Sequence, residues 1–306
     1  MRFTNPVLVG AIVLLAACTS SPSSSVDSGG GAGGAASGGT SGGATGGATG
    51  SGGQGPIEDG GGGAITPADA ASLPTDGAAA EATPASGMKP SRALLYALSN
   101  GGHLLHPSIG PAEMALQDAL MPLGFTVDIS VDPTKFSATG LQGYAVVVLI
   151  DSSGMPFGNP GTDSMDALLS FVRGGGGLVG IHSASLVDYA PTSTFVTLLG
   201  GKFSGHPGGL RNSTCLSEGT HPAVVDLPKP YVVVDEFYTF VSMNADDQID
   251  LRCAGAGGVL PIAWHRTEGN GRVFYTGLGH APEEWGAATT LVKDHVLPAI
   301  LWAAGR

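Results

Sequence analysis

The chain has 306 residues and carries 25 acidic side chains against 13 basic ones, which gives a formal net charge of -12. No run of arginines or lysines offsets this acidic balance, so no nucleic-acid partner is expected and a small neutral ligand is favoured. The composition also changes sharply along the chain.

Residues 1–18 resemble the signal of a bacterial lipoprotein. Arg2 precedes an apolar run, 7–17, that is too short to span a bilayer. The run ends in Leu-Ala-Ala followed by Cys18, the residue that is lipidated after cleavage in such proteins. We therefore expect an exported chain held by a lipid at Cys18, and Thr19 favours the outer membrane. An ordinary secretory signal, in which Cys18 has no role, is the alternative.

Residues 19–89 consist mostly of Gly, Ala, Ser, Thr and Pro and contain almost no large apolar side chain. Such a segment cannot bury enough surface to offset the entropy of ordering it, so we interpret it as a disordered tether. A flexible coil of this length reaches roughly 45 Å. The remaining segment, 90–306, is long enough for one domain with a full core.

Strand-like and helix-like patterns alternate from Arg92 onward. Continuous apolar runs predict buried strands over 93–98 and 144–150, and a shorter strand over 126–130. Helical spacing predicts helices over 111–123 and 163–173, the first ended by a glycine.

A further strand is predicted over 178–181, directly before His182. Strand, helix, strand at this spacing indicates βαβ units, so the fold class is α/β: a mostly parallel sheet with helices on both faces. Beyond residue 195 the pattern favours strands with some antiparallel pairing, at 231–234, 248–254, 261–265 and 272–276, and a closing helix at 291–304.

The sequence GGGGLVGIHSAS, 174–185, places an imidazole where many α/β enzymes have a Ser or Cys nucleophile. Ligands of open α/β sheets bind outside the carboxyl ends of the strands. The following polar residues lie near predicted strand ends: Asn100, His103, His106, Asp151, His182, Ser183, His206, Asp235, Glu236, Tyr238, Trp264, His265 and His280. A single such histidine is usually structural, whereas several at one edge indicate a site.

We predict that His182 is a base or ligand-orienting group and that Glu236, with Asp235, supplies the carboxylate of an acid–base site. His106 and His280 would contact the substrate. A divalent metal held by His106, His206 and His280 is an optional addition, since the sequence has no HExxH or paired CxxC motif.

Three aromatic side chains lie close in sequence to these polar groups: Tyr238, Trp264 and Trp285. A ring face beside hydrogen-bonding groups suits a sugar, so we assign them to substrate binding; burial of Tyr238 and Trp264 in the core is the alternative. Cys215 and Cys253 either form a disulfide, which an exported protein permits, or are two separate buried thiols.

Several motifs resemble those of the ThuA-like (trehalose utilisation) family, over about Arg92 to Gly305. In chain order these are HPSI (106–109), GGGLVGIHSA (175–184), GGKF (200–203), GHP (205–207), HP (221–222), DEFY (235–238), PIAW (261–264) and GRVFYTGLGH (271–280). The resemblance implies a flavodoxin-like fold of the class I glutamine-amidotransferase type and a link to disaccharide metabolism.

Amidotransferases of this fold have a cysteine at the position that His182 occupies. An imidazole cannot form the thioester that their reaction needs, so we do not expect amidotransferase activity. The sequence departs from the family at 102–106 and 152–157, which bear on the identity of the ligand.

The expected function is that of a lipid-tethered domain that binds and processes a carbohydrate. A non-catalytic module that binds a sugar or a partner is the first alternative, and a purely structural role for these side chains is the second.

Overall fold

The structure is a computed structural model that describes residues 91–159, 163–255 and 258–306. The predicted signal, Cys18 and the tether lie outside the described residues.

One sheet organises the described part of the chain, with strand order β2-β1-β3-β4-β11-β10-β9-β6-β7. Its parallel half consists of β1 (Ser91–Tyr96), β2 (Phe125–Ser130), β3 (Val146–Ile150), β4 (Gly177–Ile181) and β11 (Gly271–Thr276). The order 2-1-3-4 followed by a fifth parallel strand is the flavodoxin-like order. The predicted fold class is confirmed.

The other half of the sheet is antiparallel, as the sequence beyond residue 195 predicted. It consists of β10 (Gly258–Glu268), β9 (Gln248–Gly255), β6 (Arg211–Ser217) and β7 (Tyr231–Asp235). The structure joins β6 to β9 through a disulfide between Cys215 and Cys253, which face each other across the two strands. A separate two-stranded sheet pairs β5 (Lys202–Gly205) with β8 (Thr239–Val241).

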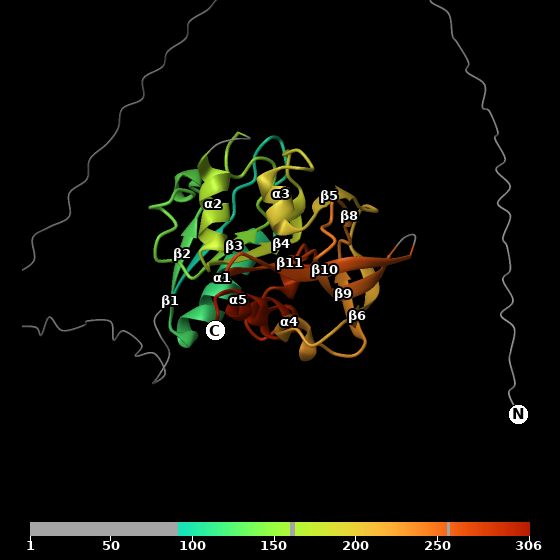
Figure 1. The fold of residues 1–306 in the computed structure, drawn as a ribbon. Helices are drawn as coiled ribbons and strands as arrows, with labels where there is room; N and C mark the ends of the chain where they lie inside the picture. Colours follow the sequence, from blue (N-terminus) through green and yellow to red (C-terminus); the bar gives the residue numbers. More distant parts are fainter. Residues whose placement is uncertain (1–90, 160–162, 256–257) are drawn as a thin grey trace, which may run out of the picture. The chain divides into compact units, whose positions relative to one another are not determined.

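Helices cover both faces of the main sheet (Figure 1). On one face lie α1 (Ile109–Leu120), α4 (Pro222–Val225) and α5 (Leu297–Ala303); on the other lie α2 (Asp163–Arg173) and α3 (Thr194–Leu199). Each presents an apolar stripe to the sheet, for example Met165, Leu168 and Val172 of α2. Strands β3 and β4 are fully buried, because helices cover the sheet on both sides there.

Two predicted helices differ in detail from those in the structure. In the first, 111–123, the apolar side chain of Met114 is 63% exposed and faces away from the core. The closing helix, predicted over 291–304, is helical without a break over 291–303, but its first part, Leu291–Val296, is π-helical and only α5 is α-helical. Pro298 has no N–H to donate to the carbonyl four residues earlier, which interrupts the regular ladder there.

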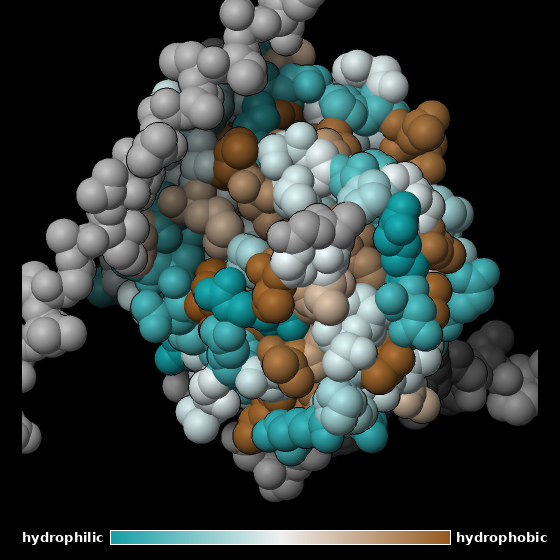
Figure 2. Space-filling model, turned by 90° about the vertical axis from the view of Figure 1, so that its right-hand side faces the viewer, coloured by the Kyte–Doolittle hydropathy of each residue, from teal (hydrophilic) through white to brown (hydrophobic). Residues whose placement is uncertain are grey.

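None of the helices in the described ranges is long and apolar enough to span a membrane. Exposed apolar side chains on the antiparallel half include Leu216, Val232, Val234 and Val259. Figure 2 shows hydrophobic and hydrophilic residues interspersed on this side of the molecule, without one continuous apolar patch.

Candidate functional site

Two adjacent parallel strands end in residues with an unusual backbone. Asp151 directly follows β3 and His182 directly follows β4, and their φ angles are +49° and +48°. Residues with side chains rarely adopt this left-handed region, and strained positions of this kind cluster at functional sites. His182 is fully buried, so its ring is held at the carboxyl edge of the sheet by the fold around it.

His182 lies in a cluster with Glu236 and two other histidines. Its Nε2 is 3.1 Å from Nδ1 of His280 and 3.6 Å from Oε2 of Glu236. The same Oε2 is 3.4 Å from Nδ1 of His280, and the other carboxylate oxygen, Oε1, is 2.9 Å from Nδ1 of His206. The structure therefore brings together residues that follow β4, β5, β7 and β11.

His106 reaches the same place from the loop before α1. Its ring centroid lies 5.1 Å from those of both His182 and His280. Its Nδ1 is 3.3 Å from Oγ of Ser183, which in turn donates to Asp151. His106 is half-buried, so the cluster opens to solvent on this side.

Asp235 holds the loops that carry two of these side chains. Its buried carboxylate accepts hydrogen bonds from the backbone N–H groups of Glu236, Gly279 and His280, at 2.8, 2.7 and 3.1 Å. We predicted a catalytic role for Asp235; with both oxygens engaged by backbone, it instead positions Glu236 and His280.

The cluster pairs an acidic group with a basic one. Burial favours the neutral form of Glu236, but the adjacent His182 imidazole and the nearby His280 and His206 outweigh it and lower the pKa of Glu236. Burial likewise opposes the charged form of His182, but Glu236, Asp151 and Asp235 outweigh it and raise the pKa of His182. The carboxylate is therefore ionised beside an imidazole that readily holds a proton.

The half-exposed His106 behaves differently. Burial lowers its pKa, and the neighbouring His182 and His280 lower it further, against the opposing effect of Asp151. His106 is therefore neutral at physiological pH, with one ring nitrogen free to accept a proton or bind a ligand.

The aromatic side chains do not line the site as predicted. Trp264 is fully buried, donates to the carbonyl oxygen of Leu199 and stacks on Tyr275, so it belongs to the core. Trp285 is 8% exposed and donates from Nε1 to the carbonyl oxygen of Gly279 beneath the His280 turn. These indoles support the site and do not face a substrate.

Tyr238 is closer to the chemistry, although it is also buried. Its ring packs on His182 with a centroid separation of 4.2 Å and on His206 at 5.5 Å. Burial raises the pKa of its hydroxyl. Tyr238 thus forms an apolar floor under the two histidines.

Ser108 was not among the predicted site residues, and Asp151 and Ser183 were noted at strand ends without a predicted role. Ser108 is buried and donates from Oγ to Oδ2 of Asp151 at 2.8 Å, while Oδ1 of Asp151 accepts from the backbone N–H and Oγ of Ser183. The sequence contained an indication of this role. Asp151 directly follows β3, just as His182 directly follows β4, and the two strands end side by side.

Two histidines near predicted strand ends lie outside the cluster. His103 pairs with Asp188 at 3.1 Å. His265 pairs with Asp250 at 2.8 Å and stacks on His221, forming a second group of metal-ligating side chains. The first such group consists of His106, His182, Glu236 and His280. Of the predicted metal set, His106 and His280 belong to this group. His206 does not, because it contacts the opposite oxygen of Glu236, and His182 and Glu236 belong to the group in its place.

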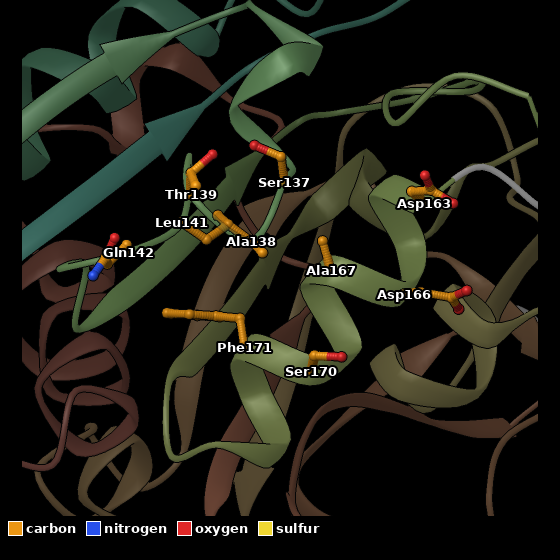
Figure 3. A pocket seen from close by; sticks show the side chains of 10 residues that line it. All are labelled: Ser137, Ala138, Thr139, Leu141, Gln142, Asp163, Asp166, Ala167, Ser170 and Phe171. Carbon is orange, nitrogen blue, oxygen red and sulfur yellow. The ribbon is translucent and has the colours of Figure 1, made fainter.

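A pocket of ≈ 750 Å³ lies between α2 and the loop 137–142. Figure 3 shows side chains of the helix facing side chains of the loop across it. Its lining contains no histidine, and its two carboxylates, Asp163 and Asp166, are exposed. The histidine cluster, by contrast, combines buried titratable groups with two strand-end residues of positive φ, so we place the candidate site there.

Solved structures of other proteins superpose on this fold. The crystal structure of a protein described as ThuA-like from Bacteroides uniformis superposes with a TM-score of 0.55 at 24% identity, over 73% of this chain and 94% of that one. A second, from Parabacteroides merdae, gives 0.54 at 20% identity, over 71% and 90%. At these identities the similarity shows the shared fold.

Among curated proteins, none matches this chain significantly. The family model ThuA, described as trehalose utilisation, matches residues 92–303. That range includes every residue of the histidine cluster. Because the match spans most of the chain and the fold agrees with it, this chain belongs to the ThuA (trehalose utilisation) family.

Proposed function

We propose that the histidine cluster binds a neutral carbohydrate and processes it by acid–base chemistry in which His182 and Glu236 take part. The family relates the domain to carbohydrate utilisation. The observation that supports the site is the convergence of Nε2 of His182, Nδ1 of His280 and Oε2 of Glu236 within 3.6 Å of one another. General acid–base catalysis requires such groups within reach of one substrate atom.

The electrostatics set the resting protonation states of the two groups. The lowered pKa keeps Glu236 a carboxylate, the form a base needs, and the raised pKa favours the protonated form of His182, the form an acid needs. His106 and His280 are half-buried, so they offer hydrogen-bonding nitrogens at the open side of the cluster. Sugar hydroxyls both donate and accept, which suits a neutral substrate better than an anion in this acidic protein.

The position of His182 argues against glutamine hydrolysis. It occupies the turn after β4, where the related amidotransferases have their cysteine, and a histidine there cannot form a thioester. The chemistry proposed for this cluster therefore needs no covalent intermediate on the side chain of residue 182.

The test uses the full-length chain in detergent. Binding of neutral disaccharides, trehalose among them, is measured by calorimetry, and turnover by chromatography of the products. We expect His182→Asn and Glu236→Gln to reduce turnover by about 10²–10⁴-fold. Asparagine is chosen because it tolerates the positive φ at position 182.

The matched control is His103→Asn, which removes a half-buried histidine that pairs with Asp188 outside the cluster. It should bind and turn over the sugar like the unmodified chain. Sugar binding that is unaffected by His182→Asn, with no turnover in any assay, would favour the non-catalytic binding module instead. A chain that binds no neutral sugar would contradict the proposal.

We also propose that the domain is exported and anchored through Cys18. The support is the signal-like pattern of 1–18, and a disulfide between Cys215 and Cys253 suits an oxidising compartment. Expressed in a Gram-negative host, the unmodified chain should partition into the detergent phase. Cys18→Ser should move it to the aqueous phase or leave the signal uncleaved, and a normally cleaved chain with an unchanged partition would contradict a lipid at Cys18.

A further inference from the structure

Three donor atoms of the histidine cluster are spaced as the ligands of a tetrahedral metal ion are. Nε2 of His182, Nδ1 of His280 and Oε2 of Glu236 form a triangle with sides of 3.1, 3.4 and 3.6 Å. With metal–ligand bonds of about 2.0–2.1 Å, two ligands of a tetrahedral zinc ion lie about 3.3–3.4 Å apart. The triangle therefore matches one face of such a tetrahedron.

Hydrogen bonding alone does not explain this triangle. A well-formed hydrogen bond between these atom types spans about 2.7–3.2 Å, which only the pair of His182 and His280 satisfies. Both distances to Oε2 of Glu236 are longer. That oxygen instead faces the two nitrogens at nearly equal distances, as a third ligand would.

The surroundings orient each donor atom in the way that metal ligands require. Nδ1 of His182 lies 2.8 Å from the carbonyl oxygen of Gly277 and donates to it, so the neutral ring presents an unprotonated Nε2 to the cluster. His206 holds Oε1 of Glu236 and leaves Oε2 directed at the cluster. A metal ion would replace the proton that His280 otherwise shares with His182.

Asp235 fixes the relative position of two of the three ligands. It accepts the backbone N–H groups of both Glu236 and His280, although these residues come from different loops. Because a metal site depends on supporting groups to hold its ligands in place, this shared carboxylate favours a preformed site.

The fourth member of the group, His106, lies beside this triangle. One of its nitrogens lies within 4.8 Å of the other donor atoms, and its ring is half-buried. Catalytic zinc sites have three protein ligands and an open position for water or substrate, whereas structural sites are closed by a fourth protein ligand. Three close ligands with a more distant histidine at the solvent side resemble the first kind.

The second group of metal-ligating side chains lacks these properties. Nδ1 of His221 accepts the backbone N–H of Ala223, which leaves the ring proton on Nε2, the atom without a hydrogen-bond partner in the described structure. The rings of His221 and His265 stack with an interplanar angle of 23°, so their lone pairs run side by side and do not converge. His265 of this second group therefore supplies the control substitution for a metal site in the histidine cluster.

We propose that His182, Glu236 and His280 bind one divalent first-row transition ion, with Zn²⁺ the best match, and leave a fourth position open toward His106. Two imidazoles and one carboxylate suit such an ion better than Mg²⁺ or Ca²⁺, which prefer oxygen ligands. The function of the ion as a cofactor rests on the proposed carbohydrate site. With the ion bound, Nε2 of His182 and Oε2 of Glu236 would be ligands and would not transfer protons themselves; a water or sugar oxygen polarised at the open position would supply the acid–base chemistry in their place. Binding of the ion does not depend on a sugar.

The test titrates ZnCl₂ into the full-length chain, in detergent, after treatment with a chelator and without any sugar. Calorimetry should show one site per chain. His280→Ala and Glu236→Gln should each weaken it by about 10²-fold or more, and His265→Asn should leave both stoichiometry and affinity unchanged. His280 is a suitable position for truncation because its side chain is 26% exposed.

Substitution with Co²⁺ supplies a second readout that does not depend on affinity. The visible absorption of four-coordinate Co²⁺ should be present in the unmodified chain and in His265→Asn, and absent from His280→Ala. Circular dichroism confirms that each variant is folded, and His182→Asn tests the third ligand with the backbone preserved.

A chain that binds no Zn²⁺, or whose binding survives His280→Ala and is lost in His265→Asn, would overturn the proposal. Failure of the metal proposal can be distinguished from failure of the proposed carbohydrate function. Failure to bind Zn²⁺ would leave sugar binding by the metal-free chain testable, and failure to bind sugar would not change the metal stoichiometry.

Discussion

His182 and His280 are 98 positions apart in the sequence, yet Nε2 of the first lies 3.1 Å from Nδ1 of the second. Their strands, β4 and β11, pair in parallel, so both chains leave the sheet at the same edge. Glu236 reaches this point from β7, at the far end of the antiparallel half. The candidate site therefore depends on how the sheet is ordered.

The carboxylate of Glu236 should control the proton affinity of His182. In chelator-treated protein, Glu236→Gln removes the adjacent carboxylate that raises the pKa of His182, so this pKa should fall. Imidazole NMR signals followed against pH measure the change. Glu218→Gln, which removes an exposed carboxylate paired with Arg252, should leave the His182 titration unaltered. An unshifted titration in Glu236→Gln would show that the two side chains do not interact.

Asp235 should stabilise the fold as well as the site. Asp235→Asn replaces a buried carboxylate that accepts three backbone hydrogen bonds with an amide that has one acceptor oxygen. We expect the free energy of unfolding to fall by about 2–3 kcal/mol, measured by urea denaturation. The exposed Asp226→Asn should change it by no more than about 0.5 kcal/mol. Equal effects of the two substitutions would refute the positioning role of Asp235.

Acid should destabilise the fold through two buried histidines. Burial lowers the pKa of His221 to about 3, aided by His265 and His295, and burial lowers that of His295 to about 4. In the unfolded chain both titrate near 6.5, so between about pH 6.5 and 4 the unfolded state binds more protons. The free energy of unfolding should therefore fall with falling pH, by up to about 1.4 kcal/mol per pH unit for each histidine.

Urea midpoints at pH 7, 6 and 5 measure this slope. His221→Asn isolates one contribution, because asparagine can still cap α4, as Nδ1 of His221 does toward the N–H of Ala223. The variant should show a shallower pH dependence. If its slope equals that of the unmodified chain, His221 is not held neutral by the fold.

The disulfide should stabilise the antiparallel half of the sheet. Cys215 and Cys253 are separated by 38 positions, and closing a loop of that length in the unfolded chain is worth about 4 kcal/mol at most. Reductant should therefore lower the melting temperature of the unmodified chain. The double substitution Cys215→Ala, Cys253→Ala should melt at a lower temperature and should not respond to reductant. A melting temperature of the unmodified chain that is insensitive to full reduction would contradict this contribution.

Much of the parallel half could be predicted from local pattern. The strands at 144–150 and 178–181 are continuous apolar runs, and helix α2 was predicted with its observed bounds, because a buried strand and an amphipathic helix each leave a periodic signature. Short elements such as β5, β8 and α4 were not predicted. They contain four residues or fewer, too few to show a period.

The residue types of the site could also be predicted, but not all of their roles. Histidines after strand ends indicated a cluster, and four of them, His106, His182, His206 and His280, lie around Glu236. The roles of Asp235, Trp264 and His206 differ from those predicted. Whether a carboxylate faces a substrate or a backbone, and whether an indole lies inside or outside, depends on contacts with residues far away in the sequence.

The sequence by itself determined the α/β class, the antiparallel second half and the histidines available at strand ends, since these follow from periodicity and residue type along the chain. Only the tertiary structure decided which of those side chains meet. Strand order places β4 beside β11, Asp235 ties the loops of Glu236 and His280 together, and these long-range hydrogen bonds set the 3.1–3.6 Å spacing of the three donor atoms. Such contacts join distant segments, so no local pattern encodes them.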